Sequence, residues 1–182
     1  MALEEFILLG DALWLDFVNS ARGRNAASPD RLSDPDAWAR WSSLQHLDGA
    51  GDPVPFAQIL DFRTRLTELA EAMHDGRAAP AGVIAVLNEH LGRTAGRQQL
   101  TRVGGAWRLR FAPLRPPAPL EAIARSAAAT LADGRTAVRR CAGESCSLLF
   151  TDDSANGSRR WCDPEECGRD ARIERRRQGL RR

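Results

Sequence analysis

The segment CAGESCSLLFTDDSANGSRRWCDPEECG, residues 141–168, carries the strongest structural signal in this sequence. It holds all four cysteines of the 182-residue chain in the pattern C-x4-C, fifteen residues, C-x4-C: Cys141, Cys146, Cys162 and Cys167. Four cysteines placed at random would fall in so short a window on the order of 1% of the time, which indicates a shared role. Two such pairs can bring four thiolates to one tetrahedral ion, and soft sulfur ligands favour Zn(II). Closed coordination of this kind predicts a structural metal.

Two disulfides are the competing interpretation of the same four cysteines. The N-terminus lacks the basic flank and small-residue cleavage site of a signal peptide, and no apolar run approaches the roughly 20 residues that span a bilayer. We therefore expect a cytoplasmic protein with no membrane partner, in which reducing conditions disfavour disulfides. Zinc(II) is the expected cofactor. Four thiolates around it leave a formal charge of about −2, which neighbouring cations can offset. The flanking arginines are Arg139, Arg140, Arg159 and Arg160.

The composition is typical of a folded protein and excludes disorder throughout the chain. Hydrophobic residues make up 43% and charged residues 27%, and the formal net charge is +2. A chain of this length can bury a substantial core as one domain, or as one domain with a small appendage. The sequence has no G-x-S-x-G, H-E-x-x-H, P-loop or dinucleotide-binding motif, so we do not expect an enzyme.

Residues 1–134 are expected to form a mainly helical domain with one β-hairpin, an α+β arrangement. Residues 11–19 form an apolar run that fits either a helix or a strand, and we favour the helix. Alternating residues over 99–112, with two glycines in the middle, predict the hairpin. The other helices are expected where a capping residue or proline precedes an apolar helical period. They follow Asp34–Pro35, run from Asp52–Pro53 to Gly76, begin at Pro80, and cover 120–131.

Residues 135–182 are expected to form a small four-cysteine zinc finger that ends in a basic helix. Segments 136–140 and 148–150 are candidate strands around the first cysteine pair. The last fifteen residues contain seven arginines and two acidic residues, and on a helix Ile173 and Leu180 share one stripe that we expect to anchor it. Guanidinium groups bind phosphate bidentately, which favours double-stranded DNA as the partner. The predicted phosphate contacts are Arg159, Arg160, Arg172, Arg175 and Arg176.

Polar residues alternate through the loop between the two cysteine pairs. The short side chains of Asp152, Ser154 and Asn156 can bond nearby backbone groups and hold an irregular turn. Trp161 lies beside Cys162, where its indole ring either covers the metal site or stacks on a nucleobase. Covering the metal site is the favoured interpretation.

The motif from Cys141 to Gly168, C-x4-C-x3-F-x-D-x-S-x-N-x2-R-R-W-C-x4-C-G, resembles the CGNR-type zinc finger of bacterial proteins described as stress-induced transcription regulators. The resemblance implies a DNA-binding finger with zinc on the four cysteines. One departure concerns the residues that give the motif its name. Arg169 and Asp170 stand where the family has Asn and Arg, so the contact that this pair makes is altered here.

The N-terminal half is similar to the helical domain that precedes this finger in the same family. Residues 15–20, LDFVNS, match its LDFVNT stretch, and Leu32 and Trp41 occupy positions where the family has Leu and Trp. The resemblance therefore spans nearly the whole chain. It implies that the helical domain senses a small molecule or a partner.

These observations favour a DNA-binding transcription regulator that uses the finger and its arginines on the phosphate backbone. The alternatives are a zinc-stabilised module that binds protein or RNA, and a thiol redox sensor that unfolds when oxidation releases the metal. A ligand pocket in the helical domain is a further hypothesis. The polar residues that would line it are Asp16, Asn19, Arg22 and Arg24. The sequence specifies neither the DNA sequence, the ligand nor the oligomeric state.

Overall fold

In the part of the chain that the structure describes, four helices precede the first strand, as the sequence predicts. The computed structural model describes residues 5–25, 27–47, 49, 51 and 53–179, and only the backbone of 175, 178 and 179. Asp52, Leu180, Arg181 and Arg182 lie outside these residues. Within them the elements are α1 (Leu13–Asn19), α2 (Pro35–Leu44), α3 (Phe56–His74), α4 (Ala81–Gly92), β1 (Gly96–Val103), β2 (Ala106–Pro113), α5 (Pro119–Asp133), β3 (Ala137–Arg140), β4 (Leu149–Asp152) and α6 (Cys167–Gly179). The expected fold class is confirmed.

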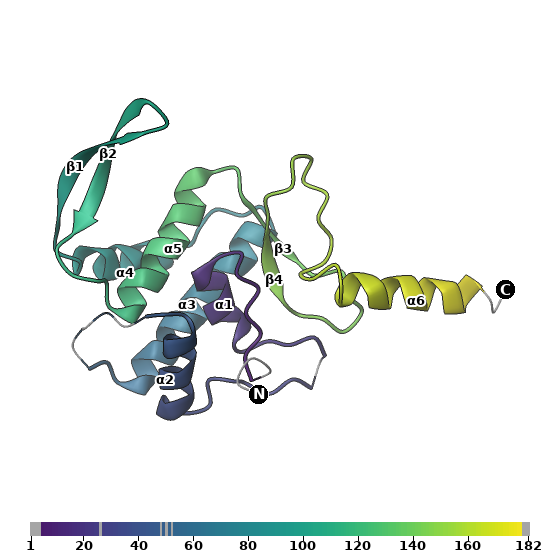
Figure 1. The fold of residues 1–182 in the computed structure, drawn as a ribbon. Coiled ribbons are helices and arrows are strands. Elements are labelled where there is room, and N and C mark those ends of the chain that lie inside the picture. The colour runs from purple at the N-terminus through teal and green to yellow at the C-terminus, as the bar shows by residue number, and fades with distance from the viewer. Residues whose placement is uncertain (1–4, 26, 48, 50, 52, 180–182) are drawn as a thin grey trace.

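Helix α1 lies at the centre of the helical region, between α3 and α5 (Figure 1). Its side chains Trp14, Leu15, Phe17 and Val18 are at most 1% exposed. The indole Nε1 of Trp14 donates to Thr130 Oγ1 of α5 at 3.0 Å. A helix that is covered on all sides needs no polar stripe, and this explains why the pattern of residues 11–19 fitted both a helix and a strand.

The predicted start of α2 is confirmed in atomic detail. Asp34 Oδ1 accepts the backbone N–H of Ala37 at 2.7 Å, and Pro35 occupies the first turn. Of the two tryptophans of α2, Trp41 is fully buried in the core and Trp38 is partly buried and packs against it. The rings of Trp38 and Trp41 stack with centroids 5.5 Å apart, and both contact Phe17 of α1.

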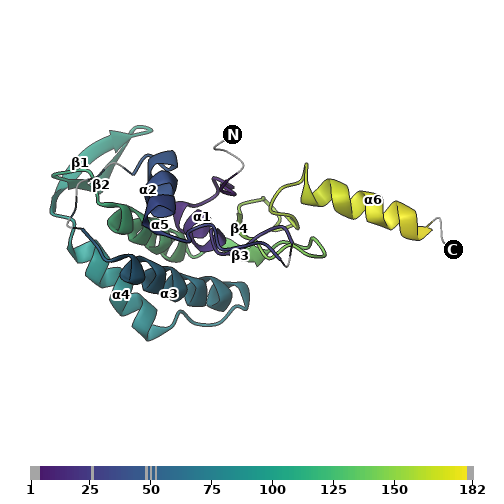
Figure 2. The ribbon, with the colours of Figure 1, turned by 90° about the horizontal axis from the view of Figure 1, so that it is seen from below.

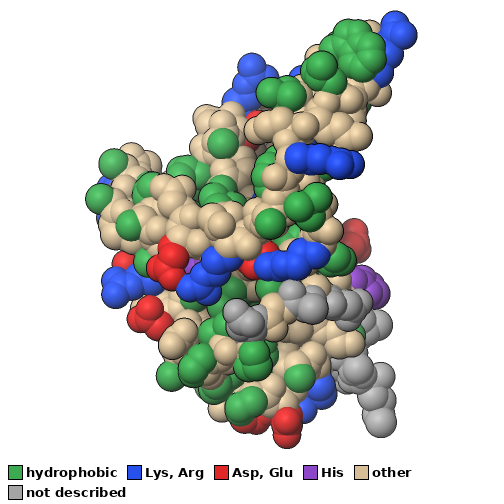
Figure 3. All heavy atoms as spheres, turned by 90° about the vertical axis from the view of Figure 1, so that its left-hand side faces the viewer, with side chains coloured by type: hydrophobic (Ala, Val, Ile, Leu, Met, Phe, Trp, Pro, Cys, Tyr) green, Lys and Arg blue, Asp and Glu red, His purple; other side chains and the backbone are tan. Residues whose placement is uncertain are grey.

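Strands β1 and β2 form an antiparallel hairpin that stands away from the helices (Figure 1). Gly104 and Gly105 have φ values of 56° and 83°, which a two-residue hairpin turn requires and glycine allows. In the described part of the chain the hairpin has no third strand, and Leu100, Trp107 and Leu109 are more than 60% exposed. Figure 3, which faces this side of the molecule, shows hydrophobic and basic side chains on the same projection.

The small sheet of β3 and β4 packs directly on the helical region. Val138 and Leu149 are at most 2% exposed and belong to the same hydrophobic core as α1 and α3. The four cysteines form a second cluster with Leu148, Phe150 and, from the N-terminal segment, Ile7 and Leu9. The proposed boundary after Gly134 thus separates two regions that share buried surface. In the described residues no helix is long and apolar enough to cross a membrane.

Candidate metal centre and nucleic-acid interface

Four sulfur atoms from separate parts of the finger meet in one buried cage. Cys141 follows β3, Cys146 lies in the β3–β4 loop, Cys162 follows the polar loop, and Cys167 begins α6. Their Sγ atoms all lie within 4.8 Å of one another, with 3.8 Å from Cys146 to Cys162 and 3.7 Å from Cys162 to Cys167. A tetrahedral ion with Zn–S bonds of about 2.3 Å requires sulfur atoms about 3.8 Å apart. The cage therefore fits zinc.

Hydrogen bonds and burial shift the pKa values of these sulfurs in different directions. Thiol hydrogen bonds from Cys146 and Cys162, with backbone N–H groups of Cys162 and Gly143 each 3.4 Å from Cys141 Sγ, lower the pKa of Cys141 to about 2. Hydrogen bonding to Cys141 raises the pKa of both Cys146 and Cys162, and burial raises the pKa of Cys167 to about 12. Because the pKa is raised at three of the four sulfurs, zinc would have to displace protons from thiols when it binds to this cage.

Arg24, from the helical region, faces this sulfur cluster. Burial alone would lower the pKa of its guanidinium, but the carboxylate of Glu166 and the sulfur of Cys162 raise it above its usual value. The side chain forms ion pairs with Glu166 and, at 3.4 Å, with Asp163. A cation held here offsets the negative charge that four thiolates place on zinc, a role that no local sequence pattern indicates.

Two of the arginines that flank the cysteines in sequence form ion pairs with carboxylates. Arg139 pairs with the buried Asp152 at 2.7 Å, and Arg140 pairs with Glu71 of α3. Arg160 is exposed and lies over the ring of Trp161 at 5.4 Å. The half-buried Trp161 packs against the cysteine cluster, in agreement with the favoured prediction that it covers the metal site.

Arg159 has a structural role, because its guanidinium group forms hydrogen bonds inside the protein. Its side chain is 21% exposed, and its Nη1 bonds Asp11 at 2.9 Å and the carbonyl of Thr151 at 3.2 Å. Nε and Nη2 donate to the carbonyls of Trp161 and Cys162 at 3.1 and 2.5 Å. Because every nitrogen has an internal acceptor, a phosphate would have to displace these bonds. We therefore leave Arg159 out of the proposed DNA contacts.

Helix α6 carries the remaining candidates away from the body of the molecule (Figure 2). The predicted contacts Arg172 and Arg176 are exposed, and so is Arg177, which was not among them. In the described part of the chain none of these three forms an ion pair. Arg175 lies on the same helix, but its side chain is outside the described atoms. The expectation that Ile173 anchors the helix is wrong, since its side chain is 42% exposed. The helix is instead fixed at its first residue, Cys167.

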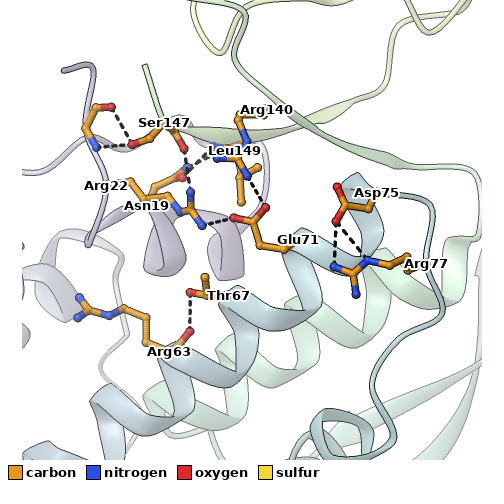
Figure 4. A network of polar contacts seen from close by, with 11 residues as sticks. Asn19, Arg22, Arg63, Thr67, Glu71, Asp75, Arg77, Arg140, Ser147 and Leu149 are labelled. Atoms are coloured by element: carbon orange, nitrogen blue, oxygen red, sulfur yellow. Dashed lines mark hydrogen bonds and ion pairs between the residues drawn. The ribbon is translucent and has the colours of Figure 1, made fainter. Parts of the chain in front are cut away.

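Of the four residues proposed for a ligand pocket, Asn19, Arg22 and Arg24 lie at the joint between the helical region and the finger. The buried Asn19 donates to the carbonyl of Leu149 at 2.8 Å and accepts its N–H at 3.0 Å. Arg22 bonds the carbonyl of Ser147 at 3.1 Å and Glu71 at 2.5 Å, and Glu71 also receives Arg140 (Figure 4). These bonds lock β4 and its preceding loop against α1 and α3.

Asp16 holds the segment that precedes α1. Its carboxylate accepts the backbone N–H groups of Leu9 and Gly10 at 2.8 and 3.3 Å and the side chain of Gln45 at 3.1 Å. Burial raises its pKa despite these bonds. Asp16, Asn19, Arg22 and Arg24 are thus all used inside the protein. Their partners Glu71 and Asp163 are distant in sequence, which is why the pattern alone could not identify the joint.

The polar loop of the finger also has the predicted structural role. Asp152 Oδ1 accepts both the N–H and the hydroxyl of Ser154, at 3.1 and 2.5 Å, and Asn156 accepts the hydroxyl of Ser158 at 2.7 Å. Gly157 has a φ of 59° and lies against Arg139. The alternating residues of the motif therefore build the turn that brings Cys162 back to the first cysteine pair.

Comparison with known proteins agrees with this geometry. Residues 11–134 match the ABATE family model, described as "Putative stress-induced transcription regulator", and residues 137–179 match the CGNR zinc finger. No curated protein matches the chain significantly. The first match covers well over half of the chain, and the second contains the sulfur cage and α6. The chain therefore belongs to the ABATE family and carries a CGNR zinc finger.

Proposed function

We propose that this protein is a DNA-binding transcription regulator in which zinc aims α6 at the phosphate backbone. The observation that carries the proposal is the position of α6. The helix begins at a metal ligand, Cys167, leaves the body of the molecule, and presents the exposed guanidinium groups of Arg172, Arg176 and Arg177 (Figure 1). Arginine binds phosphate bidentately, and a helix fixed at one end can follow a groove or the backbone.

The proposal predicts a marked salt dependence of DNA binding. If Arg160, Arg172, Arg176 and Arg177 each neutralise one phosphate, log K should fall against log[salt] with a slope near −4. Fluorescence anisotropy with a labelled random duplex at several salt concentrations measures this slope. Replacing Arg172, Arg176 and Arg177 by Gln should weaken binding and reduce the slope by about 3 units.

The hairpin supplies a control with the same change in net charge. Replacing Arg102, Arg108 and Arg110 by Gln removes three exposed guanidinium groups from the opposite end of the molecule. This variant should keep the slope of the unmodified protein. A flat salt response, or an equal loss in both variants, would contradict the proposed interface.

The proposal also covers ligand sensing by the helical region and the location of the protein in the cell. We propose that the helical region responds to a small molecule during stress, and that the protein works in the cytoplasm without catalysing a reaction. Contacts of β4 with α1 and of β3 with α3 support such a response, because bonds such as Asn19–Leu149 connect the two regions directly. DNA affinity should then change when the ligand binds.

A zinc-stabilised module that binds protein or RNA is the alternative function. The exposed apolar residues of the hairpin, among them Trp107 and Leu109, favour a protein partner at that end of the molecule. Competition separates the two functions. Polyglutamate and single-stranded RNA are added as competitors of bound duplex DNA, at the same concentration of negative charge. Displacement of the duplex by either competitor would favour the alternative function. If the protein keeps the duplex in the presence of both, the DNA-binding regulator is favoured.

A further inference from the structure

A cavity of about 600 Å³ lies in the helical region, away from the sulfur cage. It is bordered by α2, α3, α4 and the start of α5, and its size is typical of small-molecule sites, roughly 300–1,000 Å³. Part of its lining is apolar and includes Trp38, Val54, Ile59 and Leu120. A flat hydrocarbon or aromatic group would find complementary surface there, since most ligand sites combine an apolar wall with few polar groups.

The lining also contains a buried polar group with an unmet hydrogen-bonding capacity. His90 is 7% exposed, and its imidazole ring packs on Phe62 with centroids 4.3 Å apart. Within the described part of the chain, its Nδ1 is buried and has no hydrogen-bond partner. Buried polar atoms are nearly always paired in folded proteins, so an unpaired one in the lining of a cavity is available to a water molecule or to a ligand.

Charge at the cavity favours an anion. Glu121 is 5% exposed, but its carboxylate already accepts Arg115 at 2.6 Å, Thr94 Oγ1 at 2.8 Å and the N–H of Ala118 at 3.2 Å. Its charge is therefore compensated within the wall. Arg93 also lines the cavity and pairs with Glu89, one helical turn away, in an ion pair whose side chains are 48% and 62% exposed. Such surface pairs contribute little, so Arg93 can turn to a ligand at small cost.

We propose that this cavity binds a small organic anion with a flat apolar body. The body lies against Trp38 and Ile59, the anionic group meets Arg93, and a polar atom of the ligand bonds Nδ1 of His90. The site lies apart from Asp16, Asn19, Arg22 and Arg24, whose polar groups are used inside the protein. This inference rests on the sensing part of the proposed function, but ligand binding can be measured without DNA.

Isothermal titration calorimetry on the zinc-loaded full chain tests the site with benzoate, 2-naphthoate and indole-3-acetate, each compared with its neutral amide. We expect at least one acid to bind with a Kd below about 1 mM and more tightly than its amide. Arg93→Gln should weaken binding of the acid about tenfold or more and leave the amide unchanged. His90→Phe, which keeps the ring contact with Phe62, should weaken both.

Arg77→Gln is the matched control, because Arg77 is an exposed arginine paired with Asp75 outside the cavity and should leave every Kd unchanged. The proposal would be overturned if none of the three acids bound with a Kd below about 1 mM. It would also be overturned if Arg93→Gln weakened binding of the acid and of the amide equally. DNA anisotropy with and without the bound acid separates this site from the proposed function. An acid that binds but leaves DNA affinity unchanged supports the cavity and contradicts sensing.

Discussion

Replacing Asn19 by Ala should weaken the interaction between the finger and the helical region, and so lower the stability of the protein. Asn19 is completely buried and makes two hydrogen bonds to the backbone of Leu149 in β4, at 2.8 and 3.0 Å. The substitution leaves one buried N–H and one buried carbonyl without partners, each of which costs roughly 1–3 kcal/mol. We therefore expect the free energy of unfolding to fall by about 3 kcal/mol.

Urea unfolding of the zinc-saturated protein, followed by far-ultraviolet circular dichroism, measures this loss. Asn88→Ala is the matched control, because Asn88 is exposed on α4 and the change should stay within about 0.5 kcal/mol. A loss below about 1 kcal/mol for Asn19→Ala would refute the reasoning, since at least one of the two Leu149 groups would then have kept a partner.

Three further substitutions test the metal site and α6. Cys162→Ser should release zinc, which mass spectrometry of the metal measures. Because β3 and β4 share the hydrophobic core of the helices, the helices of this variant should also unfold at a lower urea concentration. Helices of unchanged stability would contradict this. Protons compete with zinc for thiolates, so zinc should be lost as the pH falls. Arg24→Gln should weaken zinc binding about tenfold, so that zinc is lost at a higher pH than from the unmodified protein. A chromogenic chelator measures the released zinc. The surface variant Arg65→Gln should change neither the zinc affinity nor the pH at which zinc is lost. Asp170→Arg adds positive charge to α6 and should tighten duplex binding, with a salt slope about 1–2 units steeper; weaker binding would argue against phosphate contact by this face.

The elements of this fold were largely readable from local patterns. The N-cap of α2 and the glycine turn of the hairpin depend on residues adjacent in sequence, and the structure confirms both. Helix α3 runs over Phe56–His74, within the predicted span from Asp52–Pro53 to Gly76, and Gly76 follows it with a left-handed φ of 67°. The cysteine spacing likewise predicted the cage, because four rare residues within one short window leave few alternatives. Helix α1 was ambiguous because burial on every side removes the polar stripe that identifies a helix.

The joint between the two regions could not be predicted, because its partners lie far apart along the chain. Arg22 meets Glu71, and Arg159 meets Asp11. Isolated polar residues carry the same signal whether they bind a ligand, DNA or another part of the protein. Arg24 was a candidate ligand residue in sequence, yet it faces the sulfurs, and Arg159 was a candidate phosphate contact, yet it holds four internal acceptors.

The central claim is that the metal holds α6 in position for DNA. A titration with a zinc chelator, in which released zinc and duplex anisotropy are recorded in the same sample, tests it most directly. Our account predicts that one zinc leaves per chain and that DNA affinity falls in proportion. Complete removal of zinc with DNA affinity unchanged would contradict the account.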